Sequence, residues 1–470
     1  MPKRRSSSHR SPRSQAGRSR RVSPRRSPQD NVRVAAEWVI ERTLSSLAPV
    51  DSFLATVLAA YDDRDRALLR ELVFGTLRWL RRIDHVITSA SSRSFADIEA
   101  VLHAPLRVAT YQLLFLDRVP AHAAVHEAVE QAHCLTHRGA ASFVNAVLRR
   151  IAREPKLSSW PVTSKDPVRR MAIELSHPDF LVRRWCENFG EERAEAFMRA
   201  NNQSRPTHLL AFRHLGGREL LAERLIDEGL EVQPSALSPL GLIVRRGNPL
   251  KSASFEKGQF YIQDEISQLA ALLPPPKPGE RVLDAAAAPG GKSFALLAWE
   301  PKTRVVMADV SPARLALLRA NLARLDLSVP LFLGDAGSPP LAGGDGLFDR
   351  VVVDLPCSGT GTLRKNPELK WRLSEAEVGR LATQASRMLN GLADRVLSGG
   401  ILVAITCSVE KEENEEVVEH FLQGRDDFQP LPLHGVLQAP RDRFIAGPGM
   451  WRVFPGGDHD GFTVHVLKRS

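Results

Sequence analysis

The first third of the chain carries a helical pattern of apolar and polar residues. From Asn31 to about Arg153, apolar residues recur three and four positions apart, as on one face of an amphipathic helix. In residues 64–84 arginines fill the opposite face, and the apolar face consists of Leu69, Leu72, Val73, Leu77 and Leu80. A basic helix face is often only solvated, so these arginines alone do not establish RNA binding. The pattern predicts a small all-helical domain at 31–153.

At about residue 258 the pattern changes to short apolar runs that alternate with helical stretches. The runs RVLDAAA, RVVMADV, VPLFLGDA, FDRVVVDLPC and GILVAITCS are typical of strands buried on both faces. Helices are expected between them at 291–299, 313–325, 374–397 and 413–424. This alternation predicts an α/β fold with a doubly wound, Rossmann-like parallel sheet at 261–470.

Two segments connect these regions. Residues 154–175 contain Pro155, Pro161 and Pro167 and are predicted to be a linker. Residues 176–260 combine a helical stretch at about 188–201 with the β-like run THLLAFRHL, which predicts a small α+β subdomain.

The excess charge of the chain is concentrated at its N-terminus. Residues 1–29 carry ten of the 64 Lys and Arg residues and no Asp or Glu, so the remaining chain has 54 residues of each sign. The segment 1–30, rich in Ser, Arg and Pro, is expected to be disordered. It is either an arm that adds salt-dependent RNA affinity or a dispensable extension. No apolar run approaches the roughly 18 residues of a membrane helix, so we expect a cytoplasmic protein without membrane contact.

The chain has four cysteines and no Cys-x-x-Cys pair among them. A zinc ribbon is therefore excluded, and we expect no metal site. In a reducing compartment the cysteines remain free thiols, namely Cys134, Cys186, Cys357 and Cys407.

A glycine-rich turn follows the first predicted strand in DAAAAPGGKS, residues 284–293. Such a turn lets the backbone approach a ligand and points free N–H groups at it. With Ala286 in place of the first glycine, the turn approximates the phosphate loop of an NTPase, and Asp354 would then hold magnesium. Against this interpretation, the strict first glycine is absent and Pro289 removes a donor N–H.

Acidic residues at the next strand ends favour a different ligand. Asp309 follows the second strand, where a carboxylate suits a ribose diol, and Asp335 follows the third, where it suits an adenine. Together with Asp354 they suit a nucleoside with a positively charged centre, such as S-adenosylmethionine. The spacing therefore favours a methyl donor over an NTPase or a dinucleotide-binding protein. Taken singly, each Asp is equally consistent with a helix cap or a turn.

Cys357 and Cys407 each follow a predicted buried strand, in PCSG and TCS. In a sheet of this type the fourth strand lies beside the first and the fifth beyond it, with neighbours about 4.8 Å apart, so the two thiols should share one cleft. C5 of a pyrimidine becomes nucleophilic when a thiolate adds to C6. A lone buried cysteine is more often an inert core residue, but two at matching strand ends favour pyrimidine C5 chemistry. The chemistry leaves open which thiol attacks.

These motifs resemble those of a known enzyme family. DAAAAPGGKS, ADVSPARL, GDA, DLPCSGTGTLRKNPELKW, ITCSVEKEENE and DGFTVHVLK are similar, in order and spacing, to motifs of the RNA cytosine-5 methyltransferases with a NOL1/NOP2/Sun catalytic domain. The segments RELVFGTLRWLRRID, LRVATYQLLFLDRVPAHAAVHEAVE and ASFVNAVLRR resemble the NusB-type helical RNA-binding domain. The combination is similar to the bacterial Sun/Fmu family of small-subunit ribosomal RNA methyltransferases.

The resemblance implies a role for each candidate residue. Cys407 would be the nucleophile that attacks C6, Cys357 would assist product release, and Asp354 would also donate toward N3 of the base. Lys292 and Arg314 would steady the local geometry. The S-adenosylmethionine site would consist of Ala286, Ala287, Ala288, Pro289, Gly290, Gly291, Lys292, Asp309, Arg314, Asp335 and Asp354.

The resemblance also implies a substrate. We expect a monomeric enzyme that methylates C5 of a cytosine in small-subunit (16S) ribosomal RNA through a covalent adduct. Three alternatives remain: the same chemistry on another RNA such as tRNA, a noncatalytic RNA-binding assembly factor, and the NTPase.

Overall fold

The computed structural model describes residues 27–341, 347–433 and 444–470. Most of the predicted basic tail lies outside this part of the chain; at its end, the amide of Asp30 donates to the carbonyl of Ser27 across 3.1 Å. The chain divides into two compact units. The helical unit comprises the chain up to Glu41, Asp51–Val73 and Val86–Trp160, and the sheet unit comprises Arg42–Val50, Phe74–His85 and Pro161–Ser470.

The described residues of the helical unit follow the predicted amphipathic pattern. Leu69, Leu72 and Val73 of the predicted apolar face are fully buried. Arg66 and Arg70 lie on the opposite face, with side chains 45% and 51% exposed. The helices that contribute to this unit are α1 (Val32–Leu44), α2 (Val50–Leu58), α3 (Asp63–Arg78), α4 (Leu80–Ser91), α5 (His103–Phe115), α6 (Ala121–Leu135) and α7 (Arg138–Arg153).

A parallel sheet forms the centre of the sheet unit, and its strand order is β9-β8-β5-β6-β7. The fourth predicted strand thus lies beside the first and the fifth beyond it, which confirms the predicted order. The strands are β5 (Arg281–Asp284), β6 (Arg304–Asp309), β7 (Leu331–Leu333), β8 (Phe348–Asp354) and β9 (Val396–Thr406).

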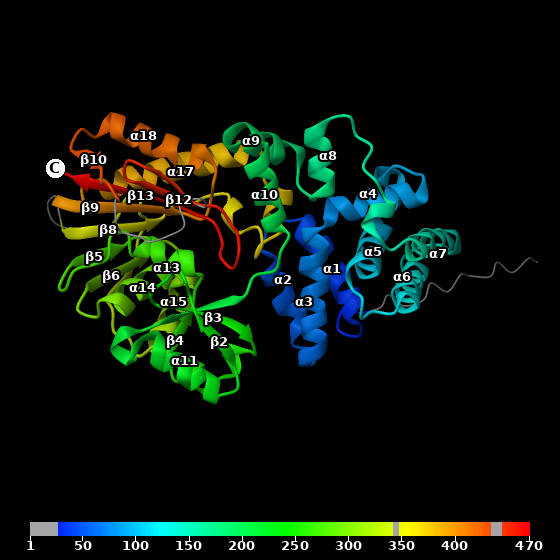
Figure 1. Ribbon diagram of the computed structural model, residues 1–470, viewed down its shortest axis with the longest axis horizontal. Helices are drawn as coiled ribbons and strands as arrows, with labels where there is room; N and C mark the ends of the chain where they lie inside the picture. The colour runs from blue at the N-terminus through cyan, green and yellow to red at the C-terminus, as the bar shows by residue number, and fades with distance from the viewer. Residues whose placement is uncertain (1–26, 342–346, 434–443) are drawn as a thin grey trace, which may run out of the picture. The chain divides into compact units, whose positions relative to one another are not determined.

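Helices cover both faces of this sheet, as Figure 1 shows. Neighbouring strand residues point to opposite faces, so Val282 joins the core beneath α14 and α15 while Leu283 joins the core beneath α17 and α18. The doubly wound α/β fold is therefore confirmed. The helices around the sheet are α13 (Glu265–Ala271), α14 (Gly291–Trp299), α15 (Pro312–Arg324), α16 (Leu369–Arg372), α17 (Glu375–Ala393) and α18 (Glu415–Gly424).

The sheet continues beyond β9 with antiparallel strands that the pattern did not predict. Thr463 pairs with Thr406 where β13 adds to β9, and β12 and β11 follow outward. β11 and β12 have only four residues each, which is too short to give a clear periodicity. These strands are β10 (Phe428–Pro430), which pairs with β13, β11 (Phe444–Gly447), β12 (Met450–Val453) and β13 (Phe462–Arg469).

A four-stranded antiparallel sheet with the order β2-β3-β1-β4 precedes α13. Leu221 and Leu225 of α11 pack against it. The segment 154–175, predicted as a linker, contains α8, whose Ala172 is fully buried. The elements of this region are α8 (Pro167–Glu174), α9 (Asp179–Phe189), α10 (Glu191–Asn201), β1 (Thr207–Ala211), α11 (Gly217–Asp227), β2 (Glu231–Pro234), β3 (Gly241–Arg246), α12 (Ala253–Glu256) and β4 (Phe260–Ile262).

Candidate active site

The two cysteines singled out by the sequence meet at the carboxyl ends of neighbouring parallel strands. Asp354, the last residue of β8, is in register with Ile405 of β9, and Cys357 and Cys407 follow these positions. Their sulfur atoms lie 3.6 Å apart, close enough for one thiol to donate to the other. Both are free cysteines with partly buried side chains. This agrees with the prediction that the two thiols lie together.

The hydrogen bond between the thiols makes them chemically unequal. It lowers the pKa of Cys407, because the Cys357 thiol donates to the sulfur of Cys407, and the positive charge of Lys292 acts in the same direction. The same bond, together with burial, raises the pKa of Cys357 well above its ordinary value. The arrangement therefore favours a thiolate on Cys407 and a protonated thiol on Cys357.

A buried glutamate holds the segment that carries Cys357. The carboxylate of Glu413 accepts hydrogen bonds from the amide and the hydroxyl of Ser358, both at 2.7 Å. Glu413 is fully buried, and burial raises its pKa to about 7. The hydroxyl of Ser408, which follows Cys407, lies 3.2 Å from that of Ser358. The residues after the two cysteines are thus joined by one polar network.

The main chain also connects the two cysteine segments. The amide of Gly361 donates to the carbonyl of Cys407 across 2.9 Å, and the carbonyl of Gly361 accepts from the amide of Gly461 across 2.7 Å. A Cβ at Gly361 would lie 2.2 Å from the carbonyl oxygen of Gly461. Only glycine fits at this crossing, which is why the PCSGTG motif carries one here.

The glycine-rich turn lies between β5 and α14. Gly290 adopts a φ of +119°, and a Cβ there would lie 2.1 Å from the ring of Phe294. Asp284 ends β5, and its Oδ2 accepts from the hydroxyl of Ser293 at 2.6 Å. Burial raises the pKa of Asp284 to about 7, and its buried Oδ1 has no hydrogen-bond partner among the residues that the structure describes. An unpaired acceptor at this strand end indicates a place for a donor group of a ligand.

Lys292 and Asp354 connect the turn to the cysteines. Nζ of Lys292 lies 2.9 Å from Oδ2 of Asp354, with the lysine side chain 9% and the aspartate side chain 42% exposed. The same ammonium lies 5.4 Å from the centre of the Phe462 ring on β13. The lysine is therefore fixed near Cys407, while half-exposed Asp354 remains accessible.

Asp309 stabilises the turn from the end of β6. Its side chain is 1% exposed and accepts from the amides of Ala288 at 3.2 Å and Ser311 at 3.0 Å. Arg314 lies 3.4 Å from the same carboxylate and also donates to the carbonyl of Ala288. The structure thus places Asp309 and Arg314 against the predicted cofactor turn.

Asp335 has a different set of contacts. It accepts from the amide of Gly337 at 2.8 Å and from Arg387 of α17 at 2.9 Å. These donors lower the pKa of Asp335. Its side chain is 38% exposed, so part of the carboxylate is available to a ligand.

The sequence missed three residues of this site. Glu413 lies in the quoted motif ITCSVEKEENE, but its contact with Ser358 spans 55 positions and has no local signal. Asp284 opens the motif DAAAAPGGKS, where its place at a strand end was a usable signal. Phe462 lies on a strand that the pattern did not predict.

A doubly wound sheet with a glycine-rich turn after its first strand and acids at the ends of the following strands is the architecture of a Rossmann-like methyltransferase. Residues 270–468 match the family model described as 16S rRNA methyltransferase RsmB/F. Residues 35–153 match the NusB family, and residues 177–251 match the Methyltr_RsmF/B-like ferredoxin-like domain. The chain belongs to the RsmB/F family of 16S rRNA methyltransferases, whose cofactor is S-adenosylmethionine.

Individual relatives support this assignment over most of the chain. The probable ribosomal RNA small subunit methyltransferase B of Bacillus subtilis (strain 168) is 36% identical over 412 residues, which cover 87% of this chain and 91% of the relative. The crystal structure of PH0851 superimposes with a TM-score of 0.75 at 26% identity, covering 94% of this chain and 99% of that one. NSun6 from Pyrococcus horikoshii, solved with SFG, shares the fold at a TM-score of 0.54 and 21% identity, over 62% of this chain and 98% of that one. The resemblance predicted from the motifs is confirmed.

The described residues contain neither a candidate membrane helix nor a candidate metal-binding group. No helix in them is both long and apolar enough to cross a membrane. Within the same residues, no group of three or more His, Cys, Asp or Glu side chains is arranged to hold a metal ion.

Proposed function

We propose that this chain methylates C5 of a cytosine in small-subunit ribosomal RNA through a covalent bond between Cys407 and C6 of the base. The observation that carries the proposal is the 3.6 Å separation of the Cys357 and Cys407 sulfurs, with the lowered pKa on Cys407. A thiolate is the form of cysteine that adds to carbon. Cys407 is therefore the nucleophile and Cys357 its partner.

In the first step, the thiolate of Cys407 adds to C6, and the electron pair of the C5–C6 double bond moves toward C5. A donor to N3 favours this addition because it stabilises the charge that develops on the ring. Asp354, half exposed beside Lys292, is the residue proposed to donate toward N3. When bound at the turn, S-adenosylmethionine would supply the methyl group that C5 takes up, and S-adenosylhomocysteine would leave.

In the second step, the C5 proton leaves and the bond between C6 and Cys407 breaks, which restores the double bond and the thiolate. Once the Cys407 sulfur is bonded to carbon, it no longer accepts a hydrogen bond as an anion. Loss of this neighbouring charge lowers the pKa of Cys357, which releases its proton to water; the resulting thiolate then takes the C5 proton directly or through a water. Cys357 thus acts in product release.

The cofactor site proposed here is the turn between β5 and α14 together with the acids around it. The unpaired Oδ1 of buried Asp284 and the free amides at the start of α14 fit a ligand with both donor and acceptor groups. Acidic residues suit its positive centre and its ribose hydroxyls. The residues that would hold it are Ala286, Ala287, Ala288, Pro289, Gly290, Gly291, Lys292, Asp309, Asp335 and Asp354, with Arg314 supporting the turn.

The domain boundaries are proposed with the function. Residues 31–153 would bind RNA, 154–175 would connect, 176–260 would form the α+β subdomain, and 261–470 would carry the chemistry. Small-subunit ribosomal RNA is the substrate favoured by the names of the relatives. The enzyme would act as a monomer in the cytoplasm.

Trapping of the covalent adduct tests the mechanism. Incubated with cofactor and deproteinised 16S ribosomal RNA, the Cys357→Ala variant should accumulate a protein–RNA adduct that survives denaturing electrophoresis. Cys407→Ala should form none, and Cys186→Ala, a partly buried cysteine of α9, should behave like the wild type. Adduct in the Cys407 variant alone would exchange the two roles, and adduct in neither would contradict both. Mapping 5-methylcytosine in cells that lack the protein then identifies the RNA and distinguishes ribosomal RNA from tRNA.

A further inference from the structure

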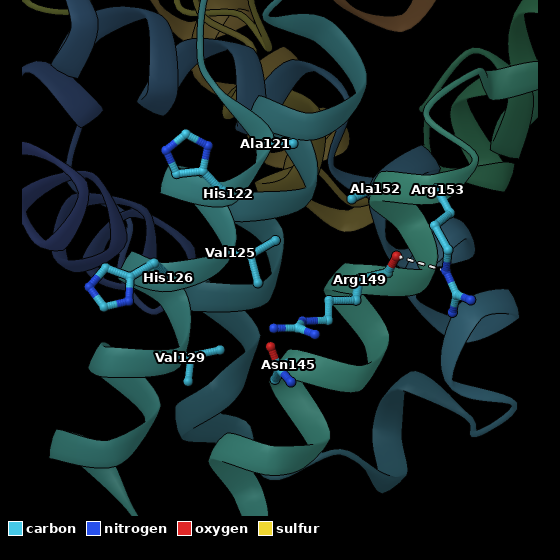
Figure 2. A pocket seen from close by; sticks show the side chains of 9 residues that line it. All are labelled: Ala121, His122, Val125, His126, Val129, Asn145, Arg149, Ala152 and Arg153. Carbon is cyan, nitrogen blue, oxygen red and sulfur yellow. Dashed lines mark hydrogen bonds between the residues drawn. The ribbon is translucent and has the colours of Figure 1, made fainter.

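A cavity of about 680 Å³ lies between α6 and α7 of the helical unit, outside the site described above. All the residues that line it belong to these two helices, as Figure 2 shows. Its volume is within the range of roughly 300–1,000 Å³ that is usual for small-molecule sites. The residues are Ala121, His122, Val125, His126, Val129, Asn145, Arg149, Ala152 and Arg153.

The lining combines an apolar surface with hydrogen-bond donors. Val125 is buried and Val129 is half-buried, and both face the cavity from α6. Arg149 and Asn145 point into the space between the helices from α7 in Figure 2. None of the described residues that line the cavity is an Asp or a Glu. Such a surface attracts an anion that also carries an apolar or aromatic group.

Within the part of the chain that the structure describes, the two arginines of the cavity have no acidic partner. α7 carries four arginines and no acid. Arg150 is engaged elsewhere, because it donates to the carbonyl of Ala90 at 3.0 Å and lies over the ring of Trp160. In the described part of the chain, Arg149 and Arg153 form no ion pair; Arg153 only donates to the carbonyl of Arg149, at 3.3 Å. Two exposed guanidinium groups at the cavity are therefore available to an external anion.

We infer that this groove, lined by α6 and α7, binds a nucleotide of single-stranded RNA. Arg149 and Arg153 contact the phosphate, because guanidinium groups match phosphate geometry and release counterions on binding. The base lies on Val125 and Val129, and His126 offers a flat ring for stacking. A free phosphate would use the arginines but not the apolar floor, which favours a nucleotide. The inference rests on the proposed RNA substrate and adds a second place at which the chain holds it.

The test compares two double variants of the full chain. Arg149→Ala/Arg153→Ala removes the cations of the groove, and Arg64→Ala/Arg118→Ala removes two exposed arginines elsewhere in the helical unit. The probe is a fluorescein-labelled single-stranded oligouridine of about twelve nucleotides. The groove variant should bind it at least about tenfold more weakly, with a salt slope smaller by about 0.7, the contribution of one neutralised phosphate on a single strand. The control should match the wild type.

Kinetics with deproteinised 16S ribosomal RNA give an independent readout. The groove variant should raise KM for RNA and leave kcat and the affinity for S-adenosylmethionine unchanged, because the groove does not touch the reacting atoms. Arg149→Lys/Arg153→Lys should recover most of the affinity, since it restores both charges. Two results would overturn the inference. One is equal affinity of the groove variant and the control for the oligouridine; the other is binding of inorganic phosphate by a chain that does not bind the oligouridine. A failure of the proposed chemistry can be distinguished from a failure of this inference, because Cys407→Ala should bind the oligouridine like the wild type.

Discussion

Glutamine in place of Glu413 should remove a pH dependence from the stability of the sheet unit. Glu413 is fully buried beneath the cysteine pair, and burial raises its pKa from 4.5 to about 7. Between these values the folded chain keeps the proton while the unfolded chain has released it. The free energy of unfolding therefore falls as the pH rises through this window.

The size of the effect follows from the displacement of the pKa. A tenfold change in proton affinity corresponds to about 1.4 kcal/mol. The displacement from 4.5 to about 7 thus amounts to roughly 3 kcal/mol between mildly acidic and mildly alkaline pH. Glutamine has no proton to release, yet its amide accepts from the amide of Ser358 and donates to the Ser358 hydroxyl. Glu413→Gln should match the wild type at about pH 5 and be more stable by roughly 3 kcal/mol at about pH 8.

Urea unfolding followed by tryptophan fluorescence, at these two pH values, measures the difference. Glu416→Gln is the matched control, because it changes an exposed glutamate of α18, the helix that begins two residues after Glu413. It should reproduce the pH dependence of the wild type. Parallel pH curves for the wild type and Glu413→Gln would refute the reasoning, since they would show that the buried carboxyl does not titrate in this window.

Two further predictions concern the same site. Lys292→Met removes a positive charge that lowers the pKa of Cys407, so alkylation of that thiol by iodoacetamide should slow at neutral pH and recover at alkaline pH; an unchanged pH profile would contradict the role of the lysine. Gly361→Ala places a Cβ 2.2 Å from the carbonyl of Gly461 and should destabilise the chain by ~1–3 kcal/mol, with loss of methylation. Its control, Gly379→Ala in α17, meets no atom within 4 Å and should stabilise by ~0.5–1 kcal/mol; thermal unfolding measures both, and equal shifts would refute the clash.

The central sheet was predictable because its information is local. Short apolar runs separated by helical periodicity define a doubly wound sheet, and the order of its strands places Cys357 beside Cys407. The antiparallel strands β11 and β12 were not predictable, because four residues give no clear period. Helix α8 was hidden by the prolines around it, one of which, Pro167, is its first residue.

The supporting residues of the site were not predictable for a different reason. The contact of Glu413 with Ser358 and that of Arg387 with Asp335 join positions about fifty residues apart. Such pairs depend on how two strands and a helix pack, and no spacing along the chain encodes it. The acid Asp309 shows the same limit: its position at a strand end was evident, but its burial beneath Arg314 was not.

The placement of β13 has a consequence for the timing of activity. This strand lies against β9, the preceding Gly461 binds the cysteine segment, and Thr463 donates to the carbonyl of Ser408 at 2.8 Å. Before Phe462 has been translated, the nascent chain lacks the strand that pairs with β9 and contacts the residue after Cys407. We expect such a nascent chain to remain inert toward RNA in the translating cell, however long its earlier domains have been folded.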